Sequence, residues 1–243
     1  MADKKKQNLE QSIEEFAKEM KEKNKKEEKE TMEEKNKKVE LNVATFSKVQ
    51  RDTEIKPKVV ARYPYINEDG EFIYEVQKMQ NAEEPYYVAR PLENGEYKPG
   101  LGKLKTIPYN LPNVIRAKEN GDVIIVTEGE SKCNVFYELG YTATTGPFKG
   151  SDKWIIRFNK YLKHANVLVI ADNDEEGRAF AENTFETISD AADNVGVIEL
   201  SDICPQLKEG GDIEDLRNIV NNDEYLKETL DSIINDLLSN KEV

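Results

Sequence analysis

The residues most able to do chemistry are a run of acids that directly follows an apolar segment. Residues 167–178 read VLVIADNDEEGR, so five apolar residues lead into Asp172, Asp174, Glu175 and Glu176. At an effective dielectric of about 20, two like charges about 4 Å apart repel by about 4 kcal/mol. Each such acid also raises the pKa of its neighbour. A cluster of this kind needs a compensating cation, and a divalent ion is the usual one.

Two further acidic turns follow apolar segments elsewhere in the chain. Glu128 and Glu130 come after VIIVT, and Asp212 opens the GDIED turn that comes after VIEL. Mg²⁺ prefers one or two carboxylates together with water and phosphate oxygens, and Asp172 and Asp174 can reach one ion from the same turn. Glu128 is then free to move a proton to or from a hydroxyl. This combination suits the making or breaking of phosphodiesters.

Three other interpretations of the acids stay open. Acids at the start of a helix cap free N–H groups and favour the helix dipole, with no ligand needed. Asp172 and Asp174 also match the beginning of an EF-hand loop, but Asn183 stands where the closing Glu is required. A phosphoacceptor pocket, with acids that bind Mg²⁺ beside a receiving Asp, gives no role to the distant Glu128.

The elements that would position these acids alternate between strand and helix from residue 122 onward. Apolar strands are predicted in DVIIVTEGE, YTATTG, VLVIADND and VGVIEL, and helices in SKCNVFYELG, from Trp154 to Lys163, in GRAFAENTFETISDAA and in GGDIEDLRNIV. This alternation predicts an α/β fold with a parallel sheet covered by helices on both faces. In such sheets the chemistry lies beyond the carboxyl ends of the strands, where the acids are placed.

Composition and pattern divide the chain into five parts. They are a charged Lys/Glu segment over 1–40, helical or disordered; a linker over 41–58; a β-rich module of hairpins over 59–120; an α/β domain over 121–222; and a C-terminal amphipathic helix over 223–243. Leu9, Ile13, Phe16 and Met20 form one short apolar stripe in the first part. That stripe belongs either to a frayed tail or to a surface that docks a partner or a second copy.

Charge and cysteine content exclude several classes of protein. The net charge is −13, and residues 167–243 hold 5 Lys/Arg against 20 acids, so that part is a poor surface for a polyanion. Two cysteines and one histidine do not complete a zinc site. The sequence shows neither a membrane-spanning run nor a signal peptide, so we expect a cytoplasmic protein without zinc and without a membrane partner.

A basic segment lies between the first two acidic turns. Lys153, Arg157 and Lys160 fall on one side of the predicted helix from Trp154 to Lys163, and Lys149 precedes it. These side chains form either a solvated face or a track for a phosphate backbone.

Taken together and in order, the motifs resemble the TOPRIM domain, the catalytic module shared by primases, topoisomerases and some nucleases. TEGESKCNVFYELGYTATTG, ADNDEEGRAFAE and KEGGDIEDL resemble segments of its primase-like branch in phages and mobile elements, and YPYINEDGEFIYEV and IPYNLPNVI resemble the β-rich part before it. The likeness covers roughly residues 59–220. It implies a TOPRIM-type sheet preceded by a small β-rich module.

The resemblance also implies roles for individual residues. Glu128 becomes the acid/base and a metal ligand, Asp172 and Asp174 the Mg²⁺ ligands (or Mn²⁺ in its place), and Asp212 a further acid of the metal site. Lys132, Lys149, Lys153, Arg157, Lys160 and Arg178 become candidates for binding nucleic acid or phosphate. Many relatives carry Lys at position 131 or an acid within 131–134, whereas this chain has Ser131, Lys132, Cys133 and Asn134.

Three functions follow from this resemblance. One is primase-like nucleotidyl transfer on single-stranded DNA or RNA with nucleotides, alongside a separate helicase, since neither the zinc module nor the fused helicase of full primases is expected here. Another is a nuclease acting in phage defence or counter-defence. The third is a non-catalytic scaffold that recruits a partner through residues 1–40.

Overall fold

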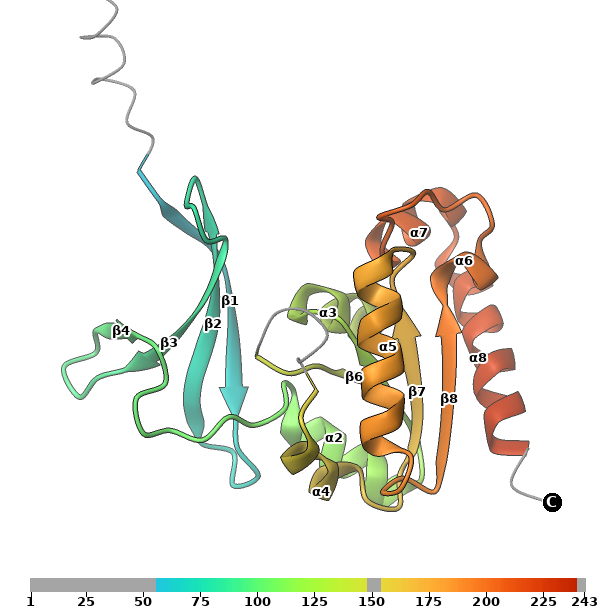
Figure 1. The fold of residues 1–243 in the computed structure, drawn as a ribbon, viewed down its shortest axis with the longest axis horizontal. Coiled ribbons are helices and arrows are strands. Elements are labelled where there is room, and N and C mark those ends of the chain that lie inside the picture. The colour runs from blue at the N-terminus through green and yellow to red at the C-terminus, as the bar shows by residue number, and fades with distance from the viewer. Residues whose placement is uncertain (1–55, 148–153, 240–243) are drawn as a thin grey trace, which may run out of the picture. The chain divides into compact units, whose positions relative to one another are not determined.

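Two sheets of different kind organise the chain, one antiparallel and one parallel (Figure 1). The structure is a computed structural model that describes residues 56–147 and 154–239. Both sheets belong to one compact unit that begins at Pro57. The predicted N-terminal segment 1–40 and most of the linker lie outside the described residues, as do Lys149 and Lys153.

The antiparallel sheet contains four strands in chain order: β1 (Lys58–Ile66), β2 (Phe72–Gln80), β3 (Tyr86–Pro91) and β4 (Tyr97–Pro99). The turn between β1 and β2 is fixed by Asn67, whose side-chain oxygen accepts hydrogen bonds from the backbone N–H groups of Asp69 (3.1 Å) and Glu71 (2.8 Å). Tyr65 and Tyr74 stack on the inner face with ring centroids 4.6 Å apart. Leu111, at the start of a helix that packs on the second sheet, packs against this face.

The parallel sheet has the strand order β6-β5-β7-β8. Its strands are β5 (Val123–Thr127), β6 (Thr142–Thr144), β7 (Asn166–Ala171) and β8 (Asn194–Glu199). Every residue of β5 and β7 is buried, as the uninterrupted apolar runs predict for central parallel strands. Thr127 pairs with Ile170, so the chain leaves both strands at the same edge, at Glu128 and at Asp172.

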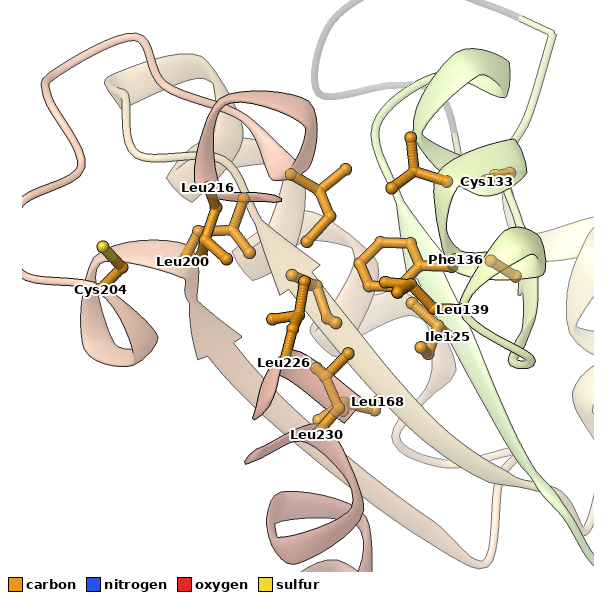
Figure 2. Packing of buried hydrophobic residues seen from close by; sticks show 14 of the residues in the cluster. Ile125, Cys133, Phe136, Leu139, Leu168, Leu200, Cys204, Leu216, Leu226 and Leu230 are labelled. Atoms are coloured by element: carbon orange, nitrogen blue, oxygen red, sulfur yellow. The ribbon is translucent and has the colours of Figure 1, made fainter. Parts of the chain in front are cut away.

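Helices cover both faces of this sheet. One face packs against α3 (Glu130–Glu138), α6 (Leu200–Ile203), α7 (Ile213–Val220) and α8 (Asp223–Ser239), as Figure 2 shows for its buried cluster. The other packs against α2 (Leu111–Asn120), α4 (Asn159–Leu162) and α5 (Glu175–Ile188). Alternate residues of β7 supply the two cores, with Leu168 and Ile170 on the first face and Val167 and Val169 on the second.

The predicted helix from Trp154 to Lys163 is shorter than expected. The structure has a 3₁₀ turn, η2 (Ile156–Phe158), followed by the single turn of α4. Side-chain hydrogen bonds hold this irregular path: the indole N–H of Trp154 donates to Asn159 Oδ1 (3.1 Å), and the guanidinium of Arg157 donates to the Thr106 hydroxyl. These hydrogen bonds anchor a 3₁₀ turn and a single helical turn where periodicity predicts a continuous helix.

The predicted α/β fold class is confirmed in the described residues: a parallel sheet covered by helices follows a small antiparallel module. The charged N-terminal helix of that prediction lies outside the described ranges. None of the helices in those ranges combines the length and the apolar character needed to cross a bilayer.

The close packing of α5 on the end of β7 leads to the first prediction. A Cβ added at Gly177 would lie 2.7 Å from the backbone oxygen and 2.8 Å from the nitrogen of Asp172. Gly177→Ala should therefore lower the free energy of unfolding by about 1–3 kcal/mol, measured by denaturant titration. Glu176→Ala, at the exposed neighbouring position, should stay within about 0.5 kcal/mol of the parent. Equal losses in the two variants would contradict this contact.

Candidate functional site

A buried ion pair occupies the carboxyl edge of the parallel sheet. Lys132 lies in the first turn of α3, directly after β5, and its ammonium pairs with Asp172 Oδ2 at the end of β7. The two side chains are only 15% and 6% exposed. The pairing joins the first two acidic turns, but through a lysine of the chain itself.

Burial and charge act in opposite directions on this pair. Burial raises the pKa of Asp172 to about 6, although Lys132 pulls it downward. Burial lowers the pKa of the Lys132 ammonium, but the surrounding carboxylates outweigh burial and the net shift is upward. Glu128 and Asp212 raise the pKa of both groups, so both lie close enough to act on the pair. The structure therefore pairs Lys132 with Asp172 and places Glu128 and Asp212 near enough to influence the pair.

Asp174 and Asp212 are both helix caps. Asp174 Oδ1 accepts a hydrogen bond from the backbone N–H of Gly177 (2.6 Å), at the start of α5. Asp212 Oδ1 accepts from the N–H groups of Glu214 (2.8 Å) and Asp215 (3.2 Å), at the start of α7. These contacts match the interpretation of the acids as N-caps.

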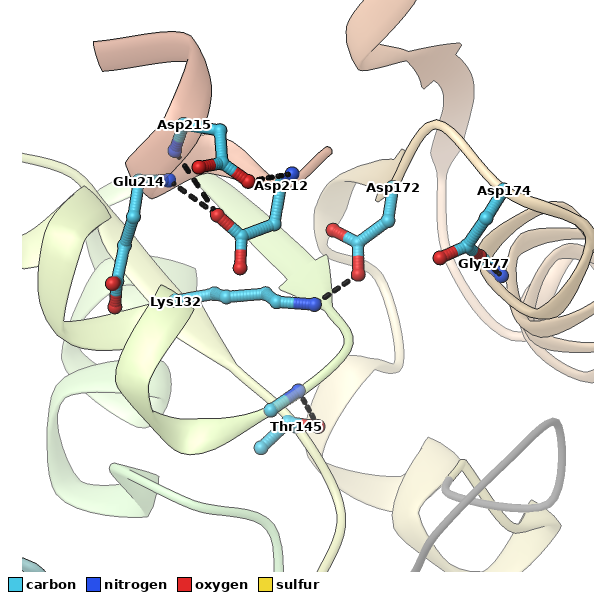
Figure 3. A network of polar contacts seen from close by, with 9 residues as sticks. Lys132, Thr145, Asp172, Asp174, Gly177, Asp212, Glu214 and Asp215 are labelled. Atoms are coloured by element: carbon cyan, nitrogen blue, oxygen red, sulfur yellow. Dashed lines mark hydrogen bonds and ion pairs between the residues drawn. The ribbon is translucent and has the colours of Figure 1, made fainter. Parts of the chain in front are cut away.

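The two caps differ in what else they face. Figure 3 shows the Asp174 carboxylate beside Gly177, on the opposite side of Asp172 from Lys132, whereas Asp212 lies on the same side of Asp172 as Lys132. The backbone supports this placement, because Asn173 N–H donates to Gly211 O (3.0 Å) and Gly210 N–H donates to Asn173 O (2.8 Å). The third acidic turn is thus attached directly to the second.

A divalent ion does not fit these residues while Lys132 holds its place. Asp172 Oδ1 is buried without a hydrogen-bond partner, which is the state of an oxygen that has room for another ligand. Its second oxygen, however, is taken by Lys132. Across the described ranges, no three His, Cys, Asp or Glu side chains are arranged to hold a metal ion. The assignment of Glu128, Asp172, Asp174 and Asp212 as metal ligands stays a prediction.

A second buried acid, Glu130, was not predicted as a site residue. Its Oε1 accepts a hydrogen bond from the Tyr65 hydroxyl (2.8 Å), which connects α3 to strand β1. The preceding Gly129 has φ 109°, a conformation that favours glycine, and its N–H donates to Thr145 Oγ1 (3.2 Å). Glu130 lies between the small residues Gly129 and Ser131, which is typical of a tight turn from strand to helix. Its hydrogen-bond partner Tyr65 lies 65 residues earlier, so no local sequence pattern could predict the contact.

A cleft of about 380 Å³ opens beside the ion pair. Its lining includes Tyr86 and Tyr87 of β3 together with Glu128, Ser131 and Lys132. Both sheets therefore contribute to one concave surface, which is lined by tyrosines, a carboxylate and an ammonium. Aromatic side chains next to charge are suited to a ligand with a planar base and a phosphate. The tyrosines were not predicted as site residues, because strand aromatics are as typical of a core.

The other predicted phosphate ligands that lie in the described ranges contact groups of the protein itself. Arg178 forms ion pairs with Glu199 (2.6 Å) and Glu209 (3.1 Å). Arg157 donates to Thr106, and Lys160 lies 4.3 Å from the ring centroid of Tyr161. Their roles in binding nucleic acid stay predictions.

Comparison with known proteins finds similarity in solved structures only. No family model and no curated protein matches the chain. Among solved structures, the zinc-binding and RNA polymerase domains of Aquifex aeolicus primase align with a TM-score of 0.51 at 19% identity, over 72% of this chain and 39% of that chain. The fold is similar to that of a primase.

Two other solved structures align with lower TM-scores. A DNA primase domain from Pseudomonas aeruginosa has a TM-score of 0.48 at 18% identity over 65% of this chain and 46% of that chain. The E. coli primase catalytic core has a TM-score of 0.46 at 20% identity over 65% and 47%. The chain spans less than half the length of these three structures.

The raised pKa of Asp172 predicts a specific pH dependence of stability. The folded protein holds this proton more tightly than the unfolded chain, so the contribution is full below pH 3.8 and is lost as pH rises through about 6. A carboxyl shifted this far changes the free energy of unfolding by up to about 3 kcal/mol. Denaturant titrations across this window, with a chelator present, should show the decline in the parent and a flatter profile in Asp172→Asn.

The control for this measurement is Glu176→Gln, which removes an exposed carboxylate from the same turn. It should keep the parent's decline with pH. A decline of the same size in Asp172→Asn would show that another group causes it.

Proposed function

We propose that this chain is a TOPRIM-type nucleic-acid enzyme whose reaction is primase-like nucleotidyl transfer. The observation that carries the proposal is the convergence of Glu128, Asp172 and Asp212 on Lys132 at the carboxyl edge of the sheet, beside a cleft lined by two tyrosines. The primase-like fold supports it. Carboxylates for proton transfer, an ammonium for phosphate and aromatic rings for a base are the groups that such a reaction uses.

The residues around the cleft divide these tasks. Glu128 lines the cleft and is the residue proposed to take the proton from an attacking hydroxyl. Lys132 lines it as well and would attract phosphate oxygens. Tyr86 and Tyr87 offer faces on which a nucleobase can stack.

The Mg²⁺ dependence implied by the sequence motifs is part of this proposal, with one condition. Asp172 can accept a divalent ion only after Lys132 moves away from it. We include Mn²⁺ as an alternative ion, and Asp174 as a ligand only if its cap on α5 is released.

The partners and setting are further parts of the proposal. The substrates are single-stranded DNA or RNA and nucleotides, with Arg157, Lys160 and Arg178 as backbone contacts that would leave their present partners. A separate helicase, or another protein bound to residues 1–40, would complete the apparatus in the cytoplasm of a bacterial cell or phage-infected host. The division at residues 59, 121 and 223 into β-rich module, TOPRIM domain and C-terminal helix is part of the same proposal.

A non-catalytic scaffold is the second candidate, and a specific observation favours it. Lys132 neutralises Asp172, and Asp174 and Asp212 cap helices, so every one of these residues has a structural use without any substrate. In that case the fold and the cleft would bind nucleic acid or a protein without reaction.

An extension assay separates these functions. The full chain is incubated with single-stranded template, labelled nucleotides and either Mg²⁺ or Mn²⁺, and the products are resolved by length. Extended strands are expected, with a rate lowered about 100-fold or more in Glu128→Gln. Glu176→Gln, which removes an exposed carboxylate outside the cleft, should match the parent. Shortened strands would indicate a nuclease, and unaltered strands with both ions would indicate the scaffold.

A further inference from the structure

Lys132 stands where a cation of this site would be expected. Its ammonium contacts Asp172 Oδ2, and Glu128 and Asp212 act on it from the neighbouring turns. The pair is removed from water, since Asp172 is only 4% exposed as a residue. Burying two charges costs free energy that only close pairing recovers, so the pair resists separation by solvent alone.

The remaining oxygen of Asp172 shows that this pairing leaves the site incomplete. Asp172 Oδ1 is buried without a hydrogen-bond partner, although most buried polar atoms in folded proteins have one. The oxygen belongs to a side chain that faces Asp212 and Lys132 rather than the solvent (Figure 3). An atom in this state has the capacity for a further cation, and the occupied neighbour Oδ2 limits how well one can bind.

Charge gives the direction of the effect. The cluster contains the three carboxylates of Glu128, Asp172 and Asp212. The Lys132 ammonium already supplies one positive charge beside them. A divalent ion that approaches Asp172 meets repulsion from Lys132 and has to displace it from Oδ2. Neutralising Lys132 removes both obstacles at once.

We propose that Lys132 is a built-in competitor of divalent cations, so that its ammonium, paired with Asp172, holds this site in a state of weak metal affinity. The proposal rests on the proposed function only in placing cation and phosphate chemistry at this edge of the sheet. The feature that carries it is a lysine at position 132, within the stretch 131–134 where the resemblance implies a lysine at 131 or an acid.

The test measures binding of Mn²⁺ alone, without template or nucleotide, by the loss of the free-ion electron paramagnetic resonance signal. Lys132→Gln keeps a hydrogen-bond donor for Asp172 and removes the charge. It should bind Mn²⁺ about tenfold more tightly than the parent. Lys132→Arg keeps the charge and should bind as weakly as the parent.

A nearby charge provides the matched control. Lys78 lies over the ring of Tyr86 (5.6 Å), a residue that lines the cleft, but it forms no ion pair with Asp172. Lys78→Gln should therefore change the affinity by about twofold or less if displacement from Asp172 is what matters. Lys132→Met provides the same neutral test if Lys132→Gln does not fold, as checked by circular dichroism.

Equal Mn²⁺ affinity in the parent and the neutral Lys132 variants would overturn the proposal, as would an equal gain in Lys78→Gln. The result is independent of the extension assay, because the ion is measured without substrate. If the parent extends no nucleic-acid strand but Lys132→Gln binds Mn²⁺ more tightly, the proposed reaction is wrong and the competition between Lys132 and the ion is supported. If the parent extends strands but Lys132→Gln gains no affinity, the reverse holds.

Discussion

The arrangement at the carboxyl edge depends on the ion pair between Lys132 and Asp172. Two central strands end side by side: β7 delivers Asp172 to a place that water scarcely reaches, and β5 delivers the half-buried Glu128 beside it. Like charges brought together out of water repel strongly, so the fold needs a cation at that point. The chain supplies it from the first turn of α3, a few residues after Glu128. The strand ends can then converge without any ligand from solution.

The pair also explains why the neighbouring acids can accept hydrogen bonds from the backbone. With Lys132 beside Asp172, the carboxylates of Asp174 and Asp212 are available to cap α5 and α7. Those caps hold both helices against the strand ends, and Gly177 allows α5 to approach within contact of the Asp172 backbone. Stability and potential chemistry therefore draw on the same side chains. A reaction at this site would require the Lys132–Asp172 ion pair or one of the helix caps to break.

Much of this architecture was predictable, and what was not has a physical reason. Apolar runs such as VLVIA and VIIVT predicted central strands because burial on both faces demands them, and their ends located Glu128 and Asp172 correctly at one edge. The direction of the Asp174 side chain was not predictable, because one torsion decides between a helix cap and a shared ion. The Tyr65–Glu130 bond joins residues far apart in the chain and has no local signature. The helix predicted from Trp154 onward is interrupted by a 3₁₀ turn, and the side-chain hydrogen bonds that hold this turn join residues that periodicity does not relate.

The coupling free energy between Lys132 and Asp172 tests the central claim most directly. It is obtained from denaturant unfolding of the parent, Lys132→Met, Asp172→Asn and the double variant, in the presence of a chelator. Each single variant leaves one buried charge without its direct partner and should lose about 3 kcal/mol. The double variant should lose less than the sum, with a coupling of about 2 kcal/mol. Losses that add to within about 0.5 kcal/mol would show that the two side chains do not stabilise one another, and the account of the site would fail.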